Sequence, residues 1–304
     1  MELARWPRQN SEVRPATGAY RWRMDVIQLL PRLHFIRFPV GHAYLWSDPD
    51  GLTLIDTGLP GAAPLLHDAI RQTGHEPADL RRVVLTHFHF DHIGAAADIA
   101  EQGQVAVLAH QADAPFVRAA GVGPAPDLAD WERPIHERVT SQLAARPMPA
   151  LIPPRIDREL ADGDELGFGD GAVAVAAPGH TPGSVAVYLP RHQVLFTGDA
   201  IARGQDGRVI CGVFNVDRAQ AAESFRRLAA LDVAVACFGH GEPLTHAAAA
   251  ALRAAAAAQA WMPFRLARGL FRTACPRARC RASRHSRGPR SGCRGPRPAC
   301  GPAA

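Results

Sequence analysis

The stretch THFHFDHIG, residues 86–94, carries four side chains that commonly bind metal ions: His87, His89, Asp91 and His92. It follows the apolar run RRVVLT, which is typical of a buried strand. Alternate residues of an extended loop point the same way, so His87 and His89 can share one ion while Asp91 and His92 face a second. Imidazole and carboxylate are good ligands for zinc, and also for iron and manganese. The stretch therefore predicts a metal site.

Three further apolar runs end in a metal-binding residue beside a glycine. VAVAAPG precedes His180, VLFTG precedes Asp199, and VAVACFG precedes His240. Ligand sites in α/β proteins lie at the carboxyl ends of strands, where loops converge. If these strands are neighbours, all seven side chains come together, and the two oxygens of Asp199 could bridge two ions.

These motifs resemble those of the metallo-β-lactamase superfamily. The matching elements are THFHFDHIG, PGHTPGS (178–184), FTGDA (196–200), FGHGEPL (238–244) and the upstream LIDTG (54–58). The resemblance covers residues 24–261. It implies an α/β fold, the four-layer αββα sandwich in which two mixed β-sheets face each other and helices lie outside.

The resemblance also implies a dinuclear site with two sets of ligands. The implied sets are His87, His89 and His180 for the first metal, Asp91, His92 and His240 for the second, and Asp199 as the bridge. Asp56 would orient ligands without binding metal. The implied cofactors are two divalent ions, with Zn²⁺ preferred and Fe or Mn as alternatives.

Two metals about 3.5–4 Å apart can hold a bridging water and lower its pKa toward neutrality, which gives a hydroxide nucleophile. Asp91 would orient this nucleophile and move its proton. The similarity to the glyoxalase II and lactonase-like branch predicts hydrolysis of a carboxylic ester, thioester or lactone. Glyoxalase II binds glutathione through a C-terminal helical domain, whereas one helix is predicted after His240, which disfavours glutathione as the substrate.

Other functions of the superfamily stay open. A β-lactamase is disfavoured because such enzymes usually act outside the cytoplasm and no signal segment is visible. Phosphodiester cleavage, as in the nuclease members, is disfavoured by an acidic body. A mononuclear-iron sulfur dioxygenase remains an alternative. A binding module without catalysis is disfavoured because all seven ligands are present.

The basic charge of the chain lies in its C-terminal segment. From residue 265 onward there are 11 arginines and no acidic residue, so residues 1–264 hold 23 basic and 29 acidic residues, a balance of −6. We therefore expect a small-molecule substrate, with nucleic acid a partner only through the basic tail. No apolar run of 18 residues and no signal segment is visible, so we expect no membrane partner and a cytoplasmic protein.

The composition divides the chain into three parts. Residues 1–23 are predicted to be a loose extension, residues 24–261 the catalytic domain, and residues 262–304 a disordered tail rich in Arg, Pro and Cys. The proline-rich segment 113–158 is interpreted as an insertion of short helices and loops near the active site. Longer helices are predicted over 63–74, 93–103, 218–231 with Asp217 as N-cap, and 246–261 with Thr245 as cap.

Several side chains near the predicted site have two interpretations. Phe116 and Trp131 could line the pocket or pack in the core. Arg203 and Asn215 follow Asp199 and could bind a substrate carboxylate or carbonyl, although a solvated loop is the favoured interpretation. His110 ends a predicted strand without a partner motif and is left out of the ligand set.

Deleting residues 263–304 is expected to leave enzymatic activity intact, because the tail has too few apolar residues to add to a folded core. The measurement compares kcat/KM of the truncated and full-length chains. A truncated protein that folds but has no activity would instead assign the tail a function.

Overall fold

The computed structural model describes residues 24–101, 103–145 and 148–258. The predicted extension 1–23 and the predicted tail 262–304 lie outside the described residues. Among the described residues, no helix combines the length and the apolar character needed to cross a bilayer.

Within this part of the chain, the first β-sheet has seven strands that lie side by side in sequence order. They are β1 (Asp25–Leu30), β2 (Leu33–Arg37), β3 (Ala43–Asp48), β4 (Gly51–Ile55), β5 (Leu80–Leu85), β6 (Ala106–His110) and β7 (Arg158–Leu160). Strands β1 to β4 pair antiparallel, and β4 to β7 pair parallel. The sheet is therefore mixed.

The second sheet contains four of the described strands, in the order β13-β10-β9-β8. Its strands are β8 (Val173–Ala176), β9 (Val185–Leu189), β10 (Val194–Phe196) and β13 (Val235–Cys237). Strands β10 and β13 are parallel, whereas β9 is antiparallel to both β8 and β10. Strands β8, β10 and β13 thus end at the same edge. A separate hairpin pairs β11 (Ile201–Arg203) with β12 (Val209–Cys211).

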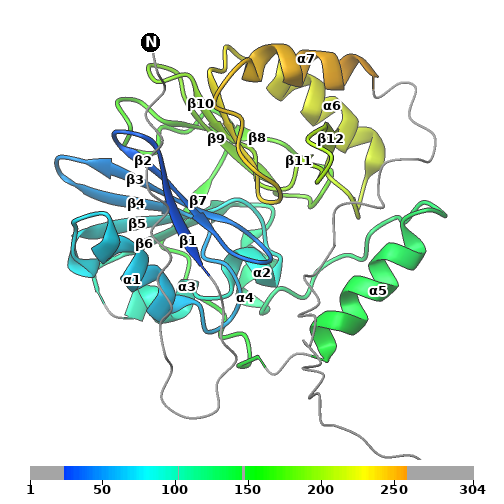
Figure 1. Ribbon diagram of the computed structural model, residues 1–304. Helices are drawn as coiled ribbons and strands as arrows, with labels where there is room; N and C mark the ends of the chain where they lie inside the picture. The colour runs from blue at the N-terminus through cyan, green and yellow to red at the C-terminus, as the bar shows by residue number, and fades with distance from the viewer. Residues whose placement is uncertain (1–23, 102, 146–147, 259–304) are drawn as a thin grey trace, which may run out of the picture. The chain divides into compact units, whose positions relative to one another are not determined.

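Alternating side chains on the strands set the order of the layers. On β3, Ala43 and Leu45 pack with helices α1 (Ala63–Gln72) and α3 (Ala96–Glu101), whereas Tyr44 and Trp46 pack between the two sheets. On β10, Leu195 packs with helices α6 (Arg218–Ala229) and α7 (Ala248–Ala258) on the other side. Because successive strand residues face opposite ways, each sheet buries both faces. The result is the predicted αββα sandwich, which Figure 1 shows with α1 and α3 on one side and α6 and α7 on the other.

The helices agree with the predictions in position and differ at their ends. The described helices are α1 (Ala63–Gln72), the 3-10 helix η1 (Pro77–Asp79), α2 (Phe90–Ile93), α3 (Ala96–Glu101), α4 (Ala114–Arg118), α5 (Arg133–Ala144), α6 (Arg218–Ala229) and α7 (Ala248–Ala258). Asp217 caps α6, because its carboxylate accepts hydrogen bonds from Ala219 N and Gln220 N. The prediction that Thr245 caps the last helix is wrong. Helix α7 starts after Ala247, whose φ is positive at 51°.

Tyr44 joins the two sheets through a buried hydroxyl. Its Oη donates to Phe238 O at 2.8 Å and accepts from Phe238 N at 3.0 Å. The ring stacks on Phe35 and meets Phe196 edge-on. The hydroxyl therefore satisfies both backbone groups of a residue two positions before His240.

Replacing Tyr44 by phenylalanine is expected to lower the free energy of unfolding by roughly 1–3 kcal/mol, because a buried donor and acceptor lose their partner. Tyr188→Phe is the matched control, since its hydroxyl donates to Asp232 O at an exposed position. Denaturant unfolding measures both variants. Equal stability of the two would contradict this role of Tyr44.

Candidate metal centre

The seven predicted ligands come from the carboxyl ends of strands, as expected. Strand β5 leads into the 86–94 stretch, and β8, β10 and β13 lead to His180, Asp199 and His240. Backbone hydrogen bonds join the connecting loops, from Val185 N to Thr86 O at 2.9 Å and from Gly239 N to Gly198 O at 2.9 Å. The ends of both sheets therefore meet at one place.

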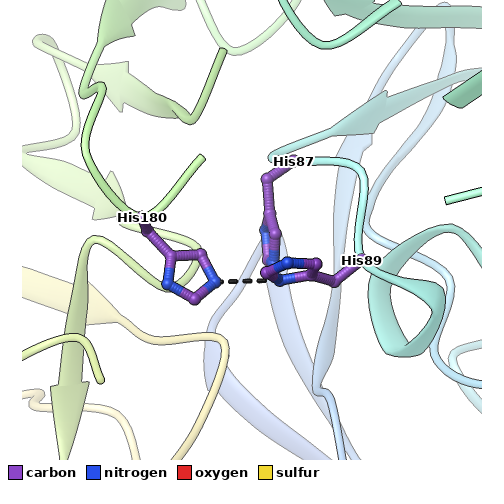
Figure 2. A group of neighbouring side chains, drawn as sticks. All are labelled: His87, His89 and His180. Atoms are coloured by element: carbon purple, nitrogen blue, oxygen red, sulfur yellow. Dashed lines mark hydrogen bonds between the residues drawn. The ribbon is translucent and has the colours of Figure 1, made fainter. Parts of the chain in front are cut away.

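His87, His89 and His180 form the first group of side chains that could hold a metal ion. His180 Nε2 lies 3.0 Å from His89 Nδ1, and Figure 2 shows the three rings turned toward one another. Burial is the largest cause that lowers the pKa of all three imidazoles, that of His89 to about 3. Neutral imidazoles have the lone pair that a metal requires.

Asp91, His92 and His240 form a second group that could hold an ion. His240 Nε2 lies 3.4 Å from Asp91 Oδ2, and His92 Nε2 lies 3.7 Å from the same oxygen. Asp199 lies between the two groups. Its Oδ2 is 3.6 Å from His180 Nε2 and 3.1 Å from His240 Nε2, and its Oδ1 is 3.4 Å from His92 Nε2.

The local backbone differs from the extended loop that the sequence predicted. Residues 86–88 form bends, and Phe90–Ile93 form the helical turn α2. Asp91 and His92 therefore leave adjacent positions of a helix, and the argument from alternating residues does not apply to them. Their side chains still reach a common group with His240 because the turn lies beside the loop after β13.

The chemistry of the cluster fits cations. Among the described residues, four buried atoms of the cluster have no hydrogen-bond partner: His87 Nε2, His92 Nε2, His180 Nδ1 and Asp199 Oδ1. Burial lowers the pKa of His240, but Asp199 and Asp91 outweigh it and raise the value to about 10. Buried carboxylates require compensating positive charge. Two divalent ions would supply it to the same donor atoms.

Asp56 fixes the orientation of two histidines. Its Oδ2 accepts from Thr86 Oγ1 at 2.7 Å and lies 2.8 Å from His92 Nδ1. Thr86 gives its only hydroxyl proton to the carboxylate, so His87 Nδ1, 3.1 Å from Thr86 Oγ1, is the donor of that contact. With Nδ1 engaged in this way, each imidazole would offer Nε2 to a metal, although Asp199 and Asp91 raise the pKa of His92 against the effect of burial, so that metal and proton would compete for it.

Asp113 connects the two loops that carry the first group. Its Oδ2 accepts from Phe88 N at 3.0 Å and from Thr181 Oγ1 at 2.7 Å, and its Oδ1 accepts from Gly183 N at 2.6 Å. The side chain is buried, and burial outweighs these three donors and raises its pKa to about 6. Asp113 thus holds the backbone beside His87, His89 and His180.

The other side chains singled out in the sequence have different surroundings. Phe116 packs against the core beside Phe88, which favours the packing interpretation, and Trp131 is half-buried. Asn215 is buried and donates to Gly212 O at 2.7 Å, so the solvated loop was wrong for this residue. Arg203 is half-buried and lines a cavity beside His240.

Sequence reasoning missed Thr86, Asp113 and His42. Thr86 was read as the end of a strand, although its hydroxyl connects Asp56 to His87. Asp113 follows β6 in the ordinary sequence HQAD, which carries no recognisable signal. His42 immediately precedes the apolar run AYLW. A histidine at the start of a buried strand was the sequence feature that could have marked it as a residue near the site.

Comparison with known proteins identifies relatives of this chain. A sequence profile of the metallo-β-lactamase superfamily matches residues 36–240. The probable metallo-hydrolase YflN of Bacillus subtilis is 29% identical over 233 residues, which cover 71% of this chain and 82% of that protein. The hydroxyacylglutathione hydrolase of Rhodobacter capsulatus is 30% identical over 201 residues, which cover 66% of this chain and 61% of that enzyme.

Solved structures show the same fold. A metallo-β-lactamase family protein of Thermus thermophilus, TTHA1429, superposes with a TM-score of 0.55 at 24% identity, covering 76% of this chain and 78% of that chain. The Rm3 metallo-β-lactamase gives a TM-score of 0.55 at 24% identity, covering 71% and 77%. At this identity the similarity concerns the fold alone.

Asp113→Asn is expected to lower the free energy of unfolding by roughly 1–3 kcal/mol at pH 8, because the new amide places a donor against a buried donor. Asp217→Asn is the matched control, since asparagine caps helices as well as aspartate. Both are measured by denaturant unfolding with a chelator present, which separates the protein from its metals. If Asp113→Asn is as stable as Asp217→Asn, Asp113 does not hold the loops.

Proposed function

The chain belongs to the metallo-β-lactamase superfamily, and we propose that it is a dinuclear metal-dependent hydrolase of a carboxylic ester, thioester or lactone. The observation that carries the proposal is the convergence of five imidazoles and two carboxylates at one edge of the sandwich, with four of their buried atoms lacking a hydrogen-bond partner in the described residues. Such donors fit divalent cations better than any hydrogen-bonding role.

The two groups would hold one ion each. The proposed ligands are His87, His89 and His180 for the first ion, Asp91, His92 and His240 for the second, and Asp199 for both. Zinc is the preferred metal because imidazole nitrogens dominate the set, and iron or manganese are the alternatives. Ions bound there would supply an activated water at neutral pH and would polarise a carbonyl oxygen.

The protein's own residues provide orientation and proton transfer. Asp91 is the proposed catalytic residue, which orients the attacking water and takes up its proton. Its carboxylate is 13% exposed and therefore adjoins the open side of the cluster. Asp56 holds His92, through the hydrogen bond to Nδ1, in the tautomer that keeps Nε2 free for a metal.

The class of bond is supported by relatives named hydroxyacylglutathione hydrolase. The Rhodobacter capsulatus protein is named a hydroxyacylglutathione hydrolase, which is a thioesterase, and it aligns with two thirds of this chain. The solved structures named metallo-β-lactamases are less than 25% identical and inform the fold only. We therefore rank thioesters, esters and lactones above β-lactams as the proposed substrates.

Purified full-length protein is expected to contain about two zinc ions per chain, measured by elemental mass spectrometry. A panel of lactones, thioesters and β-lactams then tests the class of bond. One iron ion per chain with oxygen-dependent turnover of a persulfide would instead favour a sulfur dioxygenase.

His89→Ala is expected to lose the first metal and at least 100-fold in kcat/KM, on the order of the effect of removing one electrostatic catalytic group. The sandwich should stay folded, because His89 is only half-buried. His110→Ala is the matched control, since this histidine lies at the end of β6 outside the metal-binding groups. Full activity of a folded His89→Ala protein would reject the ligand assignment.

A further inference from the structure

His42 lies beside the second metal-binding group without belonging to it. Its backbone N–H donates to Gly239 O at 2.9 Å, which holds the residue before β3 against the residue before His240. The centroids of the His42 and His240 rings are 6.4 Å apart. On its other side the His42 ring meets Phe35 edge-on, with the centroids 4.9 Å apart. The imidazole is therefore fixed between the core and the metal-binding side chains.

The two ring nitrogens of His42 have different surroundings. Nδ1 is buried and has no hydrogen-bond partner among the described residues. Nε2 makes no hydrogen bond in this part of the chain either, but it is not enclosed as Nδ1 is. A buried N–H without an acceptor is costly and rare in proteins, whereas an unused lone pair is tolerated more often. We therefore expect the proton of the ring on Nε2 and the lone pair on Nδ1.

The open side of the His42 ring faces a cavity of 330 Å³, which His42 and His240 both line. His42 is otherwise buried, so this cavity is where Nε2 can meet a bound molecule. The same molecule would contact His240 and thus lie beside the second metal-binding group. A small group fits, since 330 Å³ is near the lower limit of ligand pockets.

We propose that His42 is a further catalytic residue, which donates a hydrogen bond from Nε2 to the leaving atom of the substrate. The inference rests on the proposed hydrolase function. In a site for two ions, the attacking and the leaving atoms are stabilised on opposite sides. The cavity adjoins the second group, so the leaving atom is the part of the substrate that a donor on His42 would reach.

The hydrogen bond acts while the bond to the leaving atom breaks. The oxygen of the attacking water forms a bond to the carbonyl carbon, the bond from this carbon to the leaving oxygen or sulfur breaks, and the electron pair stays on the leaving atom. The N–H of His42 stabilises the negative charge that develops there. The proton that finally neutralises the leaving atom comes from the attacking water by way of Asp91, so His42 keeps its own proton.

Two esters that differ in the leaving group test this role with the zinc-loaded full-length chain. Ethyl acetate leaves an alkoxide with its charge on oxygen, whereas the fluorines of trifluoroethyl acetate withdraw that charge and reduce the need for a donor. His42→Phe is expected to lower kcat for ethyl acetate about tenfold more than kcat for trifluoroethyl acetate, the scale of one hydrogen bond to a charged atom.

The variants at position 42 separate the two ring nitrogens. His42→Gln places an amide N–H near the position of Nε2 and is expected to recover most of the lost turnover of ethyl acetate. His42→Asn places its amide near the enclosed Nδ1 and should recover little. His34→Phe is the matched control, since His34 also has a buried Nδ1 without a partner among the described residues but does not line the cavity. It should affect both esters equally.

Two kinetic results would overturn the proposal. One is an equal loss of turnover with both esters in His42→Phe, which would assign His42 to the fold or to the carbonyl oxygen. The other is recovery by His42→Asn and not by His42→Gln, which would place the donor on Nδ1.

Nuclear magnetic resonance separates this inference from the proposed function, because it requires no turnover. Correlations between the carbon-bound ring protons and the nitrogens of isotope-labelled histidine report which nitrogen carries the proton. The signals of His42 are those missing from His42→Gln. We expect the proton on Nε2, and we expect the Nε2 signal to move when thiophenol, which binds zinc as a thiolate, is added, while the signals of His34 stay in place.

The outcomes distinguish the two proposals. If no ester, thioester or lactone is hydrolysed, the proposed function fails, yet a protonated Nε2 whose signal responds to thiophenol still supports His42 as a donor to the leaving atom. A proton on Nδ1, or an Nε2 signal that thiophenol leaves in place, would overturn the role of His42 whatever the reaction.

Discussion

Two buried carboxylates, Asp91 and Asp199, face five imidazoles where the two sheets end, and the rest of the structure depends on this interaction. Burying a carboxylate costs free energy unless positive charge compensates it. In the absence of metal, His240 meets this demand with a pKa raised to about 10 by the two carboxylates against the effect of burial. Protons and divalent cations are thus alternative occupants of one set of donor atoms, and binding of metals would release protons.

A cluster of this kind keeps its geometry only if the backbone around it is held independently. Three hydrogen-bonded groups outside the ligand set do this. Asp56 orients His92 and, through Thr86, His87. Asp113 joins the two loops of the first group, and Tyr44 satisfies the backbone of Phe238 between the sheets. Each of these three side chains makes hydrogen bonds at more than one atom. Substituting any one of them would therefore affect more than one loop.

The fold was predictable from sequence because the metal-binding motifs resemble those of a known superfamily, and the gathering of the ligands was predictable because each motif follows an apolar run. Alternating apolar strands define the layers, and a histidine or aspartate after a strand marks the edge where the strands meet. The helical turn at Asp91 and His92 was not predictable, since the same residues fit an extended loop. Asp113 was missed because its role depends on Phe88, Thr181 and Gly183, which only the tertiary structure brings to it. Gly239 was noted only as the glycine beside His240, whereas a Cβ there would lie 2.1 Å from Asp199 Oδ1.

The metal-binding side chains and the cavity beside them come from different elements. The ligands follow core strands whose positions are fixed by packing on both faces of each sheet, so they tolerate little change. Arg203 belongs instead to a hairpin outside both sheets, and it reaches the cluster through one backbone hydrogen bond to His240. Changes in the turn of this hairpin can therefore occur while the strands of the two sheets keep the ligands in place. Superfamily membership supports metal-dependent hydrolysis, whereas the substrate depends on elements around the ligands, of which this hairpin is one.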